Sequence, residues 1–218
     1  IFANGNLIFV SYSGTADSAI IFQNGTDYLD SYSEGSTVPY GSKRPYSVVL
    51  DEVTGELYMS FFFVTGIYTF DESNFLTNGG TGIESSIFST TYKYWLADAK
   101  TRTSAKKDLW GGHGTHAPRS LVRIYHNGTS WNVVDFTAEI NSQLGSGTAI
   151  GGGRYYTDSN GDVWCLLASS SKCSVIKGTF TGADLNTPSD WTFTEILEAA
   201  NNGDLDGNGQ NWAGSWSN

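Results

Sequence analysis

A short sequence phrase recurs about every fifty residues and limits what this chain can fold into. In its clearest copies, at residues 51–58, 158–164 and 206–212, an acidic residue opens a turn, a glycine follows, and an aromatic residue stands three positions after the glycine. The chain opens inside a further copy at Gly5, and a weaker copy carries Lys107 in place of the glycine. The steps between successive copies are 50, 52, 54 and 48 residues. A regular step of this size predicts a repeat fold.

Each period shows the same order of strands, rich in β-branched and aromatic residues. Asn127-Gly128 predicts a hairpin between a third and a fourth strand, and the only helix-like stretch, 196–200, is too short to count. We expect first strands at 45–50 and 153–157, second strands at 56–61 and 162–167, third strands at 18–22, 66–70, 121–125 and 173–177, fourth strands at 130–136 and 190–196, and surface loops at 77–82, 100–107 and 141–152. Four antiparallel strands per fifty residues predict an all-β fold of about four β-propeller blades.

Two segments resemble a known family. Asp51-x-x-x-Gly55-x-x-Tyr58, followed by residues 66–71, resembles a blade of the β-propeller superfamily. Residues 157–164 resemble the Asp-box (BNR) turn of sialidase-like propellers, with Ser159 where the family has Asp and Val163 where it often has Thr. The resemblance covers the whole chain at blade level and identifies no single family. We therefore expect one propeller-like domain over residues 1–218, either complete or a fragment of a larger propeller, with a β-sandwich or jelly roll as the alternative.

Charge and composition exclude several classes of protein. A hydrophobic content of 39% argues against disorder, and a net charge of −10 makes duplex nucleic acid and anionic membranes poor partners. No apolar run approaches the roughly 20 residues of a membrane span. Seven of the twelve basic residues nevertheless fall between Lys93 and Arg123. This segment is either a solvated loop or a local anion-binding face.

Several features favour an extracellular or cell-surface protein. Cys165 and Cys173 flank a short Ser-rich loop, so a disulfide across a hairpin is geometrically possible. Asn24-Gly-Thr and Asn127-Gly-Thr are glycosylation sequons at expected turns. The chain begins at Ile1, as a processed protein or an excised piece would.

The two ends do not complete a blade. The chain starts at the second strand of one unit and ends at the second strand of another. An open sheet edge is a template for pairing, so self-association by strand addition, building a fibre, is a further hypothesis.

A Gly-rich loop at residues 110–119 holds the most chemistry. His113 and His116 are too few for a zinc site, but one of them could act as a general base while Arg119 holds a carboxylate. Trp110 could bind substrate. The alternative is a structural loop whose imidazoles bond to the backbone.

Basic residues also stand at or near the starts of predicted first strands: Arg44, Lys93 and Arg154. In a propeller the first strands line the central channel, and the sialidase-like resemblance implies an arginine cluster for a substrate carboxylate. Tyr155 is one of several interleaved tyrosines that could stack on sugars or act as acids, although blade packing is the commoner role of such residues.

Residues 204–210 show a calcium-loop pattern. Asp204, Asp206 and Asn208 supply oxygen at alternate positions around a sharp Gly turn. An EF-hand is rejected because Ser215 stands where its Glu belongs. A propeller-type Ca²⁺ loop and an ordinary polar turn both remain open.

The leading prediction is a secreted or cell-surface domain that binds an acidic glycan. The second is a lyase or glycosidase on the same scaffold, with His113, His116 and Tyr155 as catalytic candidates. The third is a subunit of an extracellular fibre. Neither a nucleophile elbow nor a P-loop is present in the sequence.

Overall fold

The computed structural model describes residues 7–13, 16–23, 27–33, 45–61, 67–70, 81–83, 94–113, 121–146, 148, 151–168 and 172–200. Side chains are described for residues 47–60, 67–69, 95–112, 121–146, 148, 154–167 and 174–198. The chain divides into two compact units, residues 1–93 and 94–218. The predicted all-β class is confirmed, because every sheet is antiparallel and has three or four strands.

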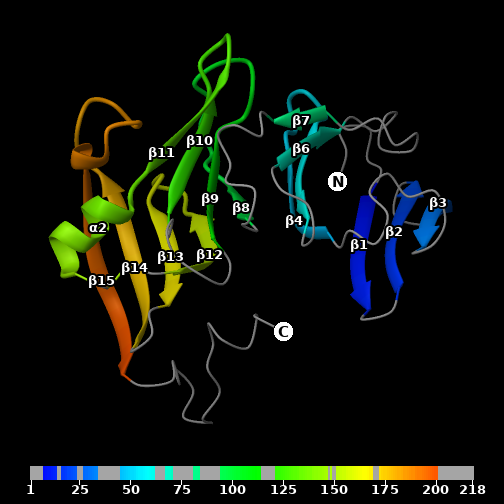
Figure 1. The fold of residues 1–218 in the computed structure, drawn as a ribbon. Coiled ribbons are helices and arrows are strands. Elements are labelled where there is room, and N and C mark those ends of the chain that lie inside the picture. The colour runs from blue at the N-terminus through cyan, green and yellow to red at the C-terminus, as the bar shows by residue number, and fades with distance from the viewer. Residues whose placement is uncertain are drawn as a thin grey trace. The chain divides into compact units, whose positions relative to one another are not determined.

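The first unit contains two sheets whose strands follow one another in sequence order (Figure 1). One sheet has three strands, β1 (Leu7–Ser13), β2 (Ala16–Gln23) and β3 (Asp27–Ser33). The other has four, β4 (Pro45–Leu50), β5 (Leu57–Phe61), β6 (Ile67–Phe70) and β7 (Thr81–Ile83). Strands β2, β4, β5 and β6 match predicted strands. No strand was predicted at β3, and β7 takes up the end of the segment predicted to be a loop at 77–82.

The second unit contains two four-stranded sheets, also in sequence order. The sheet that we call sheet C comprises β8 (Tyr94–Asp98), β9 (Leu109–His113), β10 (Val122–His126) and β11 (Trp131–Asp135). Sheet D comprises β12 (Gly151–Thr157), β13 (Val163–Ala168), β14 (Lys172–Phe180) and β15 (Trp191–Ala200). The first strand of sheet D, β12, lies beside β8 and β9 of sheet C (Figure 1).

The repeated phrase forms the same kind of turn at the end of three first strands. Asp51, Asp98 and Asp158 each accept a hydrogen bond from the backbone N–H two residues later, at 3.0, 2.7 and 2.8 Å. This arrangement satisfies backbone donors that the turn would otherwise leave unpaired. Gly55 and Gly161 have φ of 76° and 85°, which explains why these copies carry glycine.

The weaker copy is a longer loop, closed by hydrogen bonds between opposite sides. The Ala99 N–H donates to the Asp108 carbonyl, and the Asp108 N–H donates to the Thr101 carbonyl. Lys107 does not take the place of a turn glycine here. Its ammonium group is buried and pairs with the Asp98 carboxylate at 2.8 Å.

Sheets C and D pack together around an aromatic centre. The rings of Trp110 and Trp191 lie 5.2 Å apart, and Phe136 lies 5.6 and 5.8 Å from them, all in edge-on geometry. Such edge-to-face contacts are favoured between aromatic quadrupoles. Ile176 and Leu167 of sheet D complete this core.

One helix and one strand segment differ from expectation. Helix α2 (Thr137–Leu144) occupies part of a segment expected to be loop, anchored by the buried Ile140. Residues 196–200, the helix-like stretch, belong instead to β15. A 3₁₀ turn, η1 (Pro188–Asp190), precedes β15.

The predicted disulfide is wrong in this structure. Cys165 is a buried free thiol whose pKa is raised by burial. The register places Ile176 opposite Cys165, and Cys173 opposite Ala168. Three residues along a strand correspond to about 10 Å, more than a disulfide spans.

Candidate ligand-binding site

A cluster of cationic and aromatic side chains lies where the first strands of sheets C and D run side by side. We call this cluster the first-strand patch: Trp95, Lys100, Arg154 and Tyr156. The Arg154 guanidinium carbon lies 3.6 Å from the centroid of the Trp95 ring, and the Lys100 ammonium lies 5.3 Å from that of Tyr156. Both are within the range of cation–π attraction.

Local structure positions Lys100 beside β12. Its φ of 55° is the only positive value recorded for a described non-glycine residue, and its backbone N–H is held by the Asp98 carboxylate. The Thr157 hydroxyl donates to the Asp98 carbonyl at 2.7 Å, which ties the end of β12 to the end of β8. The two halves of the first-strand patch are therefore held together by backbone-anchored contacts.

The patch continues across sheet D as a row of side chains. In the strand register Tyr156 lies opposite Trp164, and Trp164 lies opposite Lys177. We call Tyr156, Trp164 and Lys177 the cross-strand row. Tyr156 is 60% exposed, and the other two are partly exposed. The Lys177 ammonium lies 5.6 Å from the Trp164 ring, so the row combines an aromatic surface with a cation.

Two carboxylates orient this row. Asp158 accepts a hydrogen bond from the Trp164 indole N–H at 2.9 Å, and this bond is the main reason that the pKa of Asp158 is lowered. Asp162 pairs with Lys177, and the hydrogen bond between them raises the pKa of Lys177. The turn that the sequence phrase builds thus fixes the orientation of the indole ring.

The exposed ring of Tyr156 and the partly exposed ring of Trp164, each next to a cation, suit a particular ligand chemistry, whereas Trp95 is buried beneath Arg154. Aromatic rings offer flat apolar surfaces for the C–H faces of sugars. A guanidinium can donate paired N–H groups to a carboxylate or sulfate. Lys100 and Arg154 are both exposed and could take that role together.

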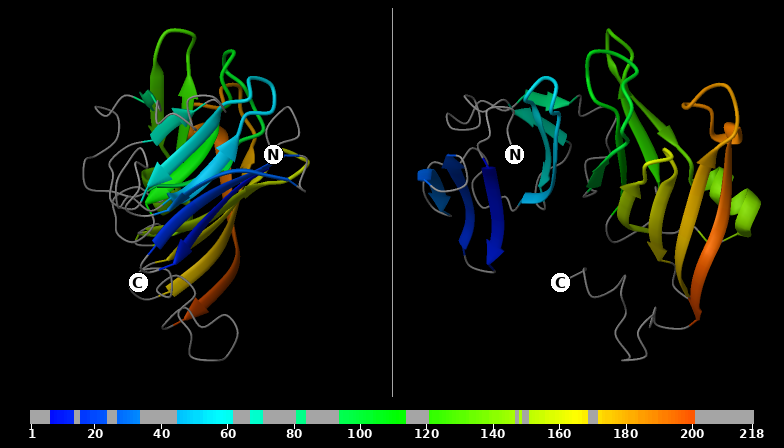
Figure 2. Two further views of the ribbon diagram at one scale, coloured as in Figure 1. Left: turned by 90° about the vertical axis from the view of Figure 1, so that its right-hand side faces the viewer. Right: turned by 180° about the vertical axis from the view of Figure 1, so that it is seen from behind.

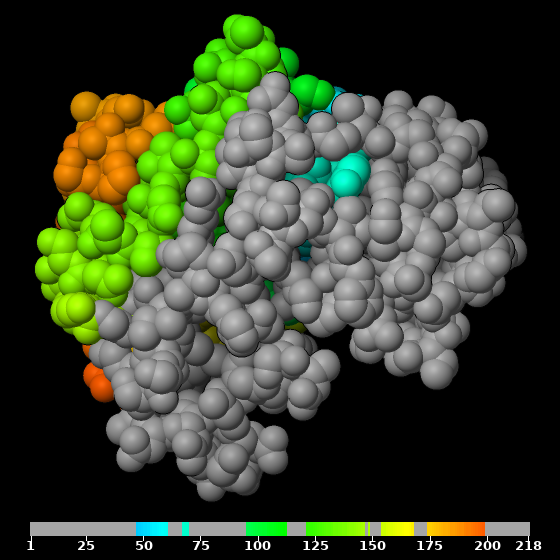
Figure 3. Space-filling model, viewed as in Figure 1, coloured from blue at the N-terminus to red at the C-terminus, as the bar shows by residue number. Residues whose placement is uncertain are grey.

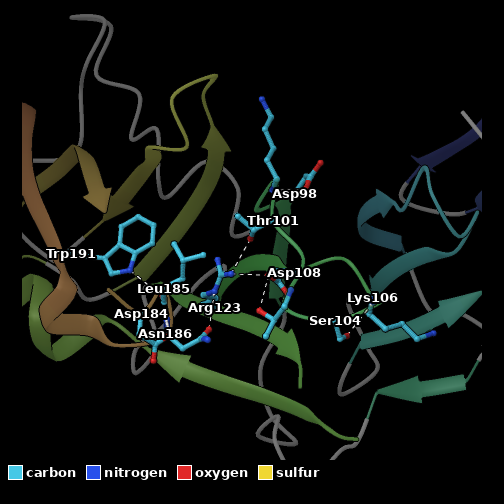
Figure 4. Close-up of polar contacts among 12 residues, drawn as sticks. Asp98, Thr101, Ser104, Lys106, Asp108, Arg123, Asp184, Leu185, Asn186 and Trp191 are labelled. Atoms are coloured by element: carbon cyan, nitrogen blue, oxygen red, sulfur yellow. Dashed lines mark hydrogen bonds and ion pairs between the residues drawn. The ribbon is translucent and has the colours of Figure 1, made fainter. Parts of the chain in front are cut away.

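The second unit also holds a fully buried ion pair with hydrogen bonds around it (Figure 4). Arg123 of β10 is 0% exposed and donates to Asp108 at 2.7 Å, to Thr101 at 2.9 Å and to Asn186 at 3.0 Å. Burial lowers the pKa of Arg123, opposed chiefly by the charge of Asp108. The Asp108 carboxylate also accepts two hydrogen bonds from Thr103. Because Asn186 lies between β14 and β15, this network joins sheet C to a loop of sheet D.

The basic segment between residues 93 and 123 is therefore not one surface. Lys107 and Arg123 are buried in ion pairs. Arg102 donates to the Ala105 carbonyl of its own loop. Among the basic residues of this segment whose side chains are described, Lys100 is the one in the first-strand patch.

Two predicted ligand-contacting residues face the core instead. Trp110 is 1% exposed, so the predicted substrate contact is wrong, because its ring is enclosed by Phe136 and Trp191. Tyr155 is half-buried and packs against the same core. It alternates along β12 with Arg154 and Tyr156, which explains its opposite orientation.

Other predicted residues are placed only in part. Asn127 is exposed in the predicted hairpin between β10 and β11, which is confirmed, and its side chain accepts the N–H groups of Thr129 and Ser130. His113 ends β9, and its side chain lies outside the description. The remaining candidates all lie outside the described residues: Asn24, Arg44, Lys93, His116, Arg119, Asp204, Asp206 and Asn208.

Sequence reasoning missed Trp95, Lys100, Trp164 and Lys177 as site residues. The register across β12, β13 and β14 brings the last two beside Tyr156. The available signal was that alternate residues of the predicted strands 154–156 and 162–167 point to the same face of a sheet, which sets Arg154, Tyr156 and Trp164 apart from the core residues between them. Within the described residues, no group of three or more metal-ligating side chains is found.

Comparisons with known proteins give a structural likeness only. No protein family model matches the sequence, and no curated protein shows significant similarity. Among solved structures, the chain is similar to PorZ, an essential bacterial surface component of the type-IX secretion system of Porphyromonas gingivalis. The TM-score is 0.57 at 16% sequence identity, over 91% of this chain and 28% of PorZ. This likeness concerns the fold, and the chain spans just over a quarter of the length of PorZ.

None of the helices described has the length and hydropathy of a membrane span.

Proposed function

We propose that this chain is a secreted or cell-surface domain that binds an acidic glycan through the first-strand patch. The observation that carries the proposal is that two exposed cations, Lys100 and Arg154, each lie on an aromatic ring where β8 and β12 run side by side. The cross-strand row extends the same surface with Trp164 and Lys177. One end of the site would hold a carboxylate or sulfate, and the rings of Tyr156 and Trp164 would stack on the sugar.

We further propose that the sheets are blades of a β-propeller. The support is the sequential four-stranded meander and the adjacency of two first strands, β8 and β12. The burial of side chains on both faces of sheet C also supports the propeller arrangement. Trp110 faces sheet D, while Leu109, Val122 and Ile124 alternate to the opposite face and are buried too. A two-layer sandwich, the alternative, packs one face of each sheet and commonly leaves the other to solvent. The packing of sheets C and D alone is consistent with both arrangements.

A surface location is supported by two observations. The structurally similar PorZ is a bacterial surface component. Asn127 of one sequon is exposed at a hairpin turn, where a glycan could be attached. The lyase alternative gains no support, because Tyr155 packs against the core.

Glycan binding is tested by titrating the chain with acidic and neutral oligosaccharides of matched length. Arg154→Ala and Lys100→Ala should each weaken binding of the acidic ligand about tenfold or more, because a charge-assisted contact is lost. Arg102→Ala is the matched control, since Arg102 bonds within its own loop. Equal binding of neutral and acidic ligands, or equal loss in the Arg102 variant, would contradict the proposal.

A further inference from the structure

The outer edge of sheet D is formed by β15, whose only partner strand among the described residues is β14. Such an edge presents backbone groups to which another strand can pair. At ten residues β15 is the longest strand described. Its edge is nevertheless occupied over part of its length.

The occupant is one side chain of α2. Gln143 donates from Nε2 to the Trp191 carbonyl at 2.8 Å and accepts at Oε1 from the Phe193 N–H at 2.7 Å. Its carboxamide therefore satisfies two of the backbone groups that a neighbouring strand would use. Nε2 also donates to Glu139 one helical turn earlier, which fixes the amide plane. Helix α2 lies against β15 in Figure 1 and in the right-hand view of Figure 2, and Figure 3 shows it at the molecular surface.

We propose that Gln143 acts as a strand surrogate that closes the β15 edge, and that the occupant it excludes is β15 of a second copy of this chain. The bonded groups belong to residues 191 and 193, so the odd-numbered residues here direct their backbone outward, away from β14. An antiparallel pair of β15 strands centred on Phe193 uses the same groups from both copies. Such a contact is isologous and needs only this one surface.

Side-chain chemistry agrees with that register. A pairing centred on Phe193 sets Thr192 opposite Thr194, a favourable cross-strand pair. Glu195 then faces Trp191 of the other copy, so no two carboxylates oppose each other. Ile196, beyond the closed part of the edge, is 50% exposed and would add apolar contact.

The test compares Gln143→Ala with Ser142→Ala, an exposed neighbour on the same helix. Amide hydrogen exchange at Phe193 should become roughly tenfold faster in Gln143→Ala alone. Sedimentation equilibrium should show concentration-dependent dimers of the Gln143 variant. Adding Ile196→Lys should suppress them, since charge on an edge opposes strand addition.

Circular dichroism checks that each variant keeps its strands. A Gln143→Ala protein that stays monomeric up to its solubility limit would overturn the proposal, even with faster exchange, because the helix alone would then close the edge. Dimers that persist with Ile196→Lys would also overturn it, since they would form elsewhere.

Discussion

Sheets C and D each carry a tryptophan at the aromatic position of the repeat, but the one in sheet C is buried and the one in sheet D is partly exposed. Trp110 and Trp164 each stand three residues after the turn position, as Tyr58 does in the first unit. Trp110 is 1% and Tyr58 0% exposed, whereas Trp164 is partly exposed beside Tyr156 and Lys177. The sequence pattern thus sets where an aromatic points, and the packing of the next layer decides whether it becomes core or surface.

The largest expected contrast comes from truncating the two equivalent tryptophans. Trp110→Ala should lower the free energy of unfolding by about 3–5 kcal/mol, because it removes the ring that Phe136 and Trp191 pack against. Trp164→Ala should cost about 1 kcal/mol, since its ring is partly solvated. Urea unfolding followed by circular dichroism measures both. Equal losses of unfolding free energy in the two variants would contradict the contrast between the buried Trp110 and the partly exposed Trp164.

The second contrast concerns buried and exposed cations. Arg123→Met should lower the free energy of unfolding by roughly 3–5 kcal/mol, because it leaves the Asp108 carboxylate buried without its ionic partner. The double variant Arg123→Met/Asp108→Leu should recover part of that loss. Lys100→Ala, at an exposed residue, should change stability little. A double variant less stable than Arg123→Met would show that the network contributes more than the pair of charges.

The smallest expected effect is the pH dependence of the turn before Trp164. The pKa of Asp158 is lowered in the folded chain, so its contribution to stability is present above the unfolded pKa, about 3.9, and is lost as pH falls through the folded value. Asp158→Asn should therefore reduce the loss of Tm between pH 6 and pH 3. Backbone hydrogen bonds also lower the pKa of Asp190, so Asp190 keeps its own pH-dependent contribution to stability in this variant. An unchanged Tm profile would contradict the role of the Asp158 carboxylate.

The sequence predicted what is decided locally. An aspartate bonded to the N–H two residues on, and a glycine at positive φ, depend on a few neighbouring residues, so the turns after β4 and β12 were predictable. The strand order followed from the repeat. The propeller arrangement itself stays a proposal.

Longer-range contacts escaped prediction. Arg123 meets Asp108 fifteen residues away and Asn186 sixty-three residues away, and nothing in the local pattern distinguishes it from the exposed Lys100. Helix α2 was missed because its eight residues lack a strong apolar period and are held by tertiary packing of Ile140. Trp110 was predicted to contact substrate because the rings that enclose it, Phe136 and Trp191, are far from it in the sequence.

The most direct test of the account follows the indole N–H signals of the tryptophans by NMR while an acidic oligosaccharide is added. We expect the signal of the partly exposed Trp164 to shift and saturate, while that of the enclosed Trp110 stays in place. Saturable binding that leaves Trp164 unmoved, or no binding by any acidic oligosaccharide, would contradict the proposed site.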